Sequence, residues 1–229
     1  MSLDNKCFEF KSGSFNHNWL PRLSVKQVNS PSGRYYETPE GNHYTSVTTF
    51  LSSFNKDIID GWRNAVGEEE ANKVSKRAAT RGTTLHENVE QYLKNDTVTI
   101  DKNRLVDVSL MKGIIPLLNR INDIRLLESP LYSHTFKLAG TVDCVASFDG
   151  APSIIDFKTA GKLKDKETIE NYFIQTSIYS WMVEERYGVK VPQLVILMSQ
   201  EFGKPQVFIE HRKNWSSHIK NLLKSVSTK

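Results

Sequence analysis

Two acids and a lysine that could work together lie close in the second half of this 229-residue chain. Asp143 is followed thirteen positions later by Asp156, and Lys158 comes two positions after that. Carboxylate oxygens are ligands that Mg²⁺ and Mn²⁺ prefer, whereas zinc sites favour nitrogen and sulfur. These residue types predict a divalent-metal site with an amine beside it.

The two acids lie in segments that read as neighbouring strands. Residues 139–148 and 152–158 are apolar and rich in Val, Ile and Phe, and Asp149-Gly150 between them is a strong signal for a two-residue hairpin turn. In the register set by that turn, Asp143 falls opposite Asp156, with Cβ atoms about 5 Å apart. The lysine two residues beyond the second acid points to the same face. The hairpin therefore predicts that both carboxylates share one cation.

The alternative is a surface hairpin whose charged side chains face water, since antiparallel sheets often have one solvated face. The segment Ile154-Ile-Asp-Phe-Lys158 places its charges inside a strongly apolar strand. Unpaired charges there would be costly to bury. This favours a buried site over a solvated face.

The spacing of the acids and lysine resembles the core of the PD-(D/E)XK nuclease superfamily, with Asp156-Phe-Lys158 as its final motif. Upstream, the segment 82–90 is similar to the G-x-x-x-H-x-x-x-E helix of RecB-type nucleases. Downstream, the segment 175–179 is similar to their Q-x-x-x-Y helix. Residues 34–49 further resemble RecB-type exonucleases of phages and of mitochondrial genome maintenance. The resemblance covers about residues 34–210.

The resemblance implies an α/β fold with a restriction-endonuclease-like core, a mixed β-sheet flanked by α-helices. It implies a Mg²⁺- or Mn²⁺-dependent deoxyribonuclease, an exonuclease acting on single-stranded DNA or DNA ends in replication, repair or recombination. A structure-selective endonuclease and an inactive DNA-binding accessory protein are the alternatives. Replication or recombination proteins are possible partners, and a monomer is expected.

The resemblance also implies roles at the site. The catalytic residues are Asp143, Asp156, Lys158 and His86, and the metal ligands are Asp143, Asp156, the backbone carbonyl of Phe157, His86 and, as a further candidate, Glu128. The cation would lower the pKa of a bound water. Lys158 would position or deprotonate that water, or polarise the phosphate. We expect the nearby cation and partial burial to lower the pKa of Lys158.

His86 and Glu90 lie four residues apart, on one face of a helix. Glu90 would bind the metal or orient His86 through a hydrogen bond. Glu87 competes for this role, and the spacing favours Glu90. Taken alone, the spacing favours a surface His–Glu pair, and the presence of Asp143, Asp156 and Lys158 reverses this for His86.

Three further sequence features suggest DNA contacts. Lys73, Arg77 and Arg81 form a stripe leading towards His86, which could hold phosphates or be a solvated face. Gln175 is expected to bind a phosphate, a base or the lysine, and Tyr179 to stack on DNA or to pack in the core.

Gly82 interrupts the helix of His86 at a cost of roughly 1 kcal/mol relative to alanine. A nucleic acid approaching closely would explain it, and so would tight packing of the helix on a sheet.

Composition is compatible with these expectations. The net charge of +4 allows nucleic acid binding without implying it. The chain has two cysteines, Cys7 and Cys144, and an iron–sulfur cluster needs four, so no such cluster is expected. Cys144 alternates away from Asp143 and is expected in the core. No membrane span, signal peptide or transit peptide is evident, which predicts a cytoplasmic protein, in the host cytoplasm if a phage encodes it.

We expect a single nuclease domain over 1–229, with an N-terminal extension at 1–45 and a catalytic core from about 46. The elements predicted from periodicity and capping signals are strands at 22–28, 33–38, 126–136, 139–148, 152–158, 192–199 and 205–211, and helices at 46–54, 57–65, 68–93, 105–125 (kinked or interrupted at Pro116), 168–187 and 214–226.

Overall fold

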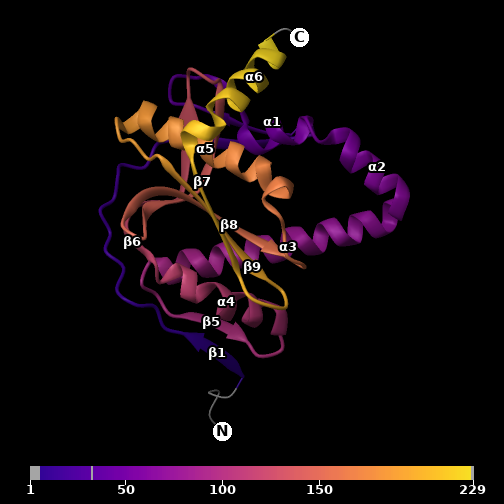
Figure 1. The fold of residues 1–229 in the computed structure, drawn as a ribbon, viewed down its shortest axis with the longest axis vertical. Coiled ribbons are helices and arrows are strands. Elements are labelled where there is room, and N and C mark those ends of the chain that lie inside the picture. Colours follow the sequence, from indigo (N-terminus) through magenta and orange to yellow (C-terminus); the bar gives the residue numbers. More distant parts are fainter. Residues whose placement is uncertain (1–5, 32, 228–229) are drawn as a thin grey trace.

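The computed structural model describes residues 6–31 and 33–227, and these form a mixed β-sheet between two layers of helices (Figure 1). Helices α3 and α4 cover one side of the sheet, and α1, α5 and α6 lie on the other. The helices are α1 (Val47–Ser53), α2 (Lys56–Val66), α3 (Glu68–Leu93), α4 (Leu105–Leu118), α5 (Glu170–Tyr187) and α6 (Ser216–Ser227), with 3₁₀ turns at Lys166–Ile169 and Arg212–Trp215.

The main sheet has the strand order β10-β9-β8-β7-β4-β3-β2, and β6 also pairs with β7. A small second sheet pairs β1 with β5. The strands are β1 (Cys7–Phe10), β2 (Lys26–Ser30), β3 (Gly33–Glu37), β4 (His43–Ser46), β5 (Val98–Asp101), β6 (Ile121–Ser133), β7 (Leu138–Phe148), β8 (Ala151–Ala160), β9 (Gln193–Gln200) and β10 (Gln206–His211). The predicted fold class, a mixed sheet flanked by helices, is confirmed.

The central hairpin has the predicted register. Phe148 pairs with Ala151, and the ladder continues to Cys144 opposite Ile155. The turn residues Asp149 and Gly150 have φ of 51° and 81°, the positive values that a type I′ hairpin turn requires.

Each sheet face packs against its own helical layer. Cys144, Ile155 and Phe157 belong to the core shared with α3 and α4. Val145 and Ile154 belong to the core shared with α1 and α5. Cys144 is fully buried, as the alternation predicts. By the same alternation, Asp156 lies on the α5 side, where it contacts Gln175. Alternation does not place Asp143, because Val142 and Val145 on either side of it both belong to the α5-side core.

Helix limits follow local signals in several places. The Ser46 hydroxyl caps α1 by accepting a hydrogen bond from the Thr49 amide, and Gly188 ends α5 with a φ of 69°. Helix α3 spans the predicted range.

The predicted helix at 105–125 is wrong in its last part. Helix α4 contains Pro116 and ends at Leu118, soon after the residue that lacks a donor N–H. Residues from Ile121 onwards belong to β6, where Ile121 pairs with Phe148. The local sequence did not reveal this pairing because its partner lies 27 residues away.

The N-terminal region contributes more to the fold than the predicted extension at 1–45 implied. Strands β2, β3 and β4 lie in the main sheet, and β4 joins it through a parallel pairing with β7. In the part of the chain that the structure describes, no helix is long and apolar enough to cross a membrane.

Candidate active site

The central strands separate at the place where the predicted acids lie. The β7–β8 ladder ends at Cys144 and Ile155, one pair before Asp143 and Asp156. Beyond this point β8 continues along β9, whereas β7 pairs with β4. The Asp143 Oδ2 accepts a hydrogen bond from the Phe157 amide at 2.9 Å. A buried carboxylate thus accepts a hydrogen bond from a backbone amide of the neighbouring strand at the point where the β7–β8 ladder ends.

Asp156 and Lys158 form a buried ion pair. The Lys158 Nζ lies 2.6 Å from Asp156 Oδ2, and the Gln175 Nε2 of α5 donates to Asp156 Oδ1 at 3.2 Å. Asp156 is 2% exposed, and its Oδ2 makes no regular hydrogen bond with the described residues. The Lys158 ammonium also lies 5.0 Å from the centre of the Tyr172 ring. This carboxylate oxygen is therefore buried with only an ion-pair contact.

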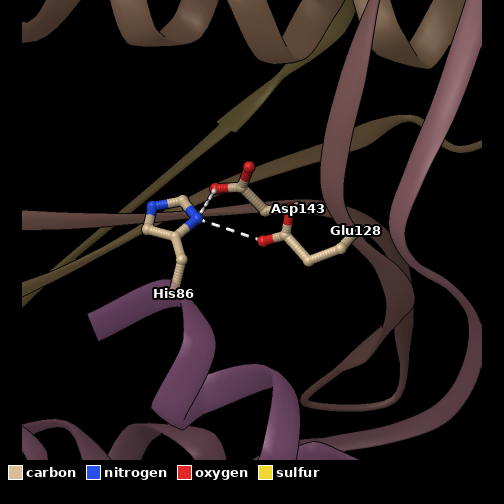
Figure 2. A group of neighbouring side chains, drawn as sticks. All are labelled: His86, Glu128 and Asp143. Carbon is tan, nitrogen blue, oxygen red and sulfur yellow. Dashed lines mark hydrogen bonds and ion pairs between the residues drawn. The ribbon is translucent and has the colours of Figure 1, made fainter. Parts of the chain in front are cut away.

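His86 reaches the same point from α3, on the other side of the sheet. Its Nε2 donates to the Phe157 carbonyl oxygen at 2.8 Å, and its Nδ1 lies 3.1 Å from Glu128 Oε1 and 3.7 Å from Asp143 Oδ2 (Figure 2). The gap between the separating strands is thus reached by side chains from both helical layers. Of the residues predicted to bind the metal, His86, Glu128 and Asp143 have potential ligand atoms close together, and the Phe157 backbone contacts two of them. Asp156, the neighbour of Phe157 on β8, lies outside this group.

Glu128 takes the position beside His86 that the sequence analysis gave to Glu90. The Glu90 carboxylate instead pairs with Lys94 at 2.7 Å, one turn later on α3. Glu128 belongs to β6 and has a φ of 41°, an uncommon backbone conformation for a residue with a Cβ. Such strain often marks functional positions. Neither this backbone geometry nor the closeness of Glu128 to His86 is visible in the sequence.

Burial and nearby charges shift the pKa values of Asp143, Asp156 and His86. Burial raises the pKa of Asp143 and, against the opposing charge of Lys158, raises the pKa of Asp156 to about 6. Burial alone would lower the pKa of His86, but the hydrogen bond to Glu128 and the charge of Asp143 outweigh it and raise that pKa to about 9. His86 therefore carries both ring protons at neutral pH, which suits its two acceptors.

The pKa of Lys158 is shifted by burial and by two neighbouring carboxylates. Burial alone would lower its pKa, but the charges of Asp156 and Asp143 outweigh burial and raise the pKa above its ordinary value. Without a bound cation, two nearby carboxylates thus stabilise the ammonium, and the lowering of this pKa by a cation stays a prediction.

The side chains present fit a divalent cation. One ligand atom each of His86, Glu128 and Asp143 lie within 4.8 Å of one another. The Asp156 Oδ2, which lacks a regular hydrogen bond, adds a further hard oxygen donor to this region. Carboxylate oxygens are the donors typical of Mg²⁺ and Mn²⁺ sites, and His86 would have to release one ring proton to join them as a ligand.

Two predicted DNA contacts are buried instead. Gln175 is 9% exposed and donates its hydrogen bond to Asp156 rather than to the lysine. Tyr179 is 2% exposed and packs in the core on the α5 side. Both residues therefore act within the protein, because α5 turns this face towards the sheet.

Gly140 is required by the position of Tyr179. A Cβ at Gly140 would lie 2.5 Å from the Tyr179 Oη and 3.0 Å from its Cε1. We expect Gly140→Ala to destabilise the protein by about 1–3 kcal/mol, the usual cost of overpacking a core. Chemical denaturation would measure it, and Tyr179→Phe combined with Gly140→Ala should recover part of the loss. A Gly140→Ala variant as stable as the wild type would contradict this contact.

The basic stripe does not lead to His86. Arg81 and His86 are five positions apart, which at 3.6 residues per turn places them about 140° apart around the helix. Arg81 forms an ion pair with Glu201, just beyond β9, and Lys73 lies 2.8 Å from Glu69. The hollow that contains His86 shares no residue with the one that contains the stripe. The predicted direction of the stripe is therefore wrong.

Gly82 lies in the hollow beside His86, together with Thr83, Glu87, Glu90 and Glu128. A Cβ at Gly82 would meet no atom within 4 Å. Tight packing against the sheet therefore does not explain this glycine, and the approach of a nucleic acid stays a prediction.

Two acids and a lysine lie where the central strands of a mixed sheet separate, an arrangement that resembles the core of a nuclease superfamily. The family model described as the PD-(D/E)XK nuclease superfamily matches residues 104–227, and the chain belongs to this superfamily. The match includes Glu128, Asp143, Asp156 and Lys158, while His86 lies upstream of it.

Curated relatives are exonucleases. The chain is 23% identical over 206 residues to human "Mitochondrial genome maintenance exonuclease 1", covering 82% of this chain and 60% of that protein. It is 24% identical over 156 residues to the mouse protein of the same name, covering 65% of this chain and 46% of that protein. This chain therefore spans about half to three-fifths of the length of these relatives.

A solved structure of a candidate exonuclease from Eubacterium rectale is also similar. Its TM-score is 0.42 at 14% identity, covering 79% of this chain and 65% of that one.

Proposed function

We propose that this protein is a Mg²⁺- or Mn²⁺-dependent DNA exonuclease that acts on single strands or on DNA ends. The observation that carries the proposal is the convergence of Asp143, Asp156, Lys158 and His86 where β7 and β8 separate. Membership of the nuclease superfamily and the names of the curated relatives support the activity.

Each residue has a role that follows from its surroundings. Asp143, Asp156 and Glu128 would hold the cation, with the Phe157 carbonyl oxygen as a nearby donor. His86 would become a ligand only on release of a ring proton. A bound divalent cation supplies Lewis-acid stabilisation of the phosphate and acidifies a water. Gln175 fixes the Asp156 carboxylate through its hydrogen bond to Oδ1.

Lys158 contributes a fixed positive charge. Its ammonium is held between Asp156 and the Tyr172 ring, and its raised pKa keeps it protonated at neutral pH. A protonated amine can orient a water or stabilise charge developing on a phosphate, but it cannot accept a proton. A bound cation would offset the two carboxylate charges that raise this pKa, so both the positioning role and the general-base role of Lys158 stay open.

The proposal is tested by digestion of labelled DNA. Linear single-stranded DNA, linear duplex DNA and RNA of the same sequence are incubated with the protein in Mg²⁺, in Mn²⁺ or in a chelator. We expect metal-dependent release of nucleotides from DNA, and none with Asp156→Asn. An inactive protein that still binds DNA would support the accessory-protein alternative instead.

Metal binding should also stabilise the fold. At a free Mn²⁺ concentration 100 times Kd, binding to the native state adds about 2.7 kcal/mol. For a protein of this size we expect the Tm to rise by about 5–10 °C. Differential scanning fluorimetry of wild type and Asp143→Asn measures this, since asparagine has nearly the same shape but no charge. An equal rise in both proteins would exclude Asp143 as a ligand.

A further inference from the structure

We propose that the groove between α3 and α4 is a second nucleic-acid surface, separate from the metal site, that holds the phosphate backbone of a long DNA substrate. This α3–α4 groove has a volume of about 440 Å³. The lining residues used below are Lys73, Lys76, Arg77, Thr80, Thr84 and Arg104. The inference rests on the proposed function for its choice of DNA as ligand.

The first observation is that this half of α3 is helical without being packed. Residues 72–80 are all exposed, although α3 continues through them as one helix. Most helices in globular proteins are held by one buried face, and a helix that is solvated all round needs another reason to persist. A helix projecting from the body is open to a large partner.

The second observation is the charge of this segment. Residues 71–86 contain four Lys and Arg residues and no Asp or Glu. Lys76 and Arg77 have no ion-pair partner among the described residues. Arg104, at the start of α4, adds a cation from the opposite wall of the groove. Asp107 also lines the groove and pairs with Arg104, and Lys73 pairs with Glu69. The lining cations still outnumber the one lining acid, and this excess of positive charge favours a polyanion.

The third observation is that polar groups repeat along the groove. Lys73, Arg77, Thr80 and Thr84 lie three or four residues apart, so each successive turn of α3 presents a cation or a hydroxyl. From residue 73 to residue 84 the helix rises about 16 Å. A row of this length suits a polymer of regularly spaced phosphates better than a single small anion.

Two of the cations are held in fixed orientations. The Arg104 Nε donates to Asp107 Oδ2 at 2.7 Å, and its Nη2 donates to the Thr84 hydroxyl at 3.1 Å. Arg81 is tied to Glu201 at the edge of the groove. These contacts order the walls and leave Lys76 and Arg77 as the cations to meet a phosphate.

The position of the groove decides what it can do. Its cations lie on a different face of α3 from His86, so they cannot act on the phosphate being cleaved. They can hold only a part of the substrate that lies away from the metal. The α3–α4 groove should therefore raise affinity for long strands and leave the hydrolysis of short ones unchanged.

The test compares Lys76→Gln/Arg77→Gln with Lys26→Gln/Lys190→Gln, a control that removes two exposed cations elsewhere. Binding is measured in a chelator, with single strands of about 30 and of about 4 nucleotides, the latter near the shortest site of single-strand binders. For the long strand we expect roughly tenfold weaker binding by the groove variant and a salt slope smaller by about 1.4, because two phosphate contacts are lost. The control variant should bind like the wild type.

Hydrolysis separates this inference from the proposed function. With metal present, the groove variant should cleave the short strand at the wild-type rate. Wild-type affinity of the groove variant for the long strand would overturn the inference. If that variant instead lost binding to polyglutamate, the groove would be assigned to an acidic protein. If neither the wild type nor any variant cleaves DNA, but the groove variant still binds the long strand more weakly, the proposed function is wrong and the inference about the groove is supported.

Discussion

Replacing Lys158 with alanine is expected to slow DNA cleavage by roughly 10²- to 10⁴-fold, the range typical for loss of a group that assists at the reacting centre. The ammonium lies 2.6 Å from Asp156, in the region where the candidate metal ligands meet. DNA binding should change little, since Lys158 is mostly buried and offers little surface to a strand. Single-turnover cleavage of an end-labelled strand measures the rate.

Two controls show whether Lys158 acts on the substrate or only on its neighbour. Without the ammonium, the pKa of Asp156 should rise further, because an opposing charge that lowers it is gone. Titration calorimetry with Mn²⁺ tests whether the ion still binds, and thermal unfolding tests whether the fold survives. Lys94→Ala is the matched control variant, since Lys94, like Lys158, is ion-paired to an acid, in this case Glu90 of α3. Cleavage by Lys158→Ala at a near wild-type rate would refute the assignment, and loss of the unfolding transition would make the residue structural.

Covalently closed single-stranded circles are expected to survive conditions in which the same sequence, once linearised, is fully degraded. The proposed exonuclease requires a free end, and a circle offers none. The resemblance of the His86 helix, of the segment 175–179 and of the N-terminal segment to end-processing exonucleases motivates this prediction. Gel analysis of both forms over time, with Asp156→Asn as the inactive control, measures it.

Equal rates on circles and linear strands would reassign the protein as an endonuclease while leaving the metal site as proposed. The sizes of the products also distinguish the two activities, since an endonuclease first converts a circle to full-length linear DNA. An exonuclease releases short products from linear DNA while most of the remaining strand is still long.

The sequence by itself determined the centre of the site. Period-two alternation and the Asp149-Gly150 turn are local properties of the chain, and together they predicted the β7–β8 register as far as Cys144 and Ile155, one pair before Asp143 and Asp156. The cap at Ser46, the extent of α3 and the end of α5 at Gly188 were also predictable, because each depends on residues within one or two turns.

Other features were decided only by tertiary structure. The β7–β8 ladder ends one pair before the acids because the two strands part towards different neighbours, β4 and β9. The β4 pairing spans more than 90 residues, and no local pattern encodes it. Glu128 replaces Glu90 beside His86 because β6 brings it there in a strained backbone conformation.

The sequence also does not show what each face of a helix contacts. Spacing tells which residues of a helix share a face, but packing decides what that face meets. Gln175 turns to Asp156 and Tyr179 to Gly140 because α5 lies against the sheet on that side. The stripe of Lys73, Arg77 and Arg81 turns away from His86 because the five positions from Arg81 to His86 correspond to a rotation of about 140°. A sequence gives the angle between two residues on a helix, and only the packed structure shows which of them faces the site.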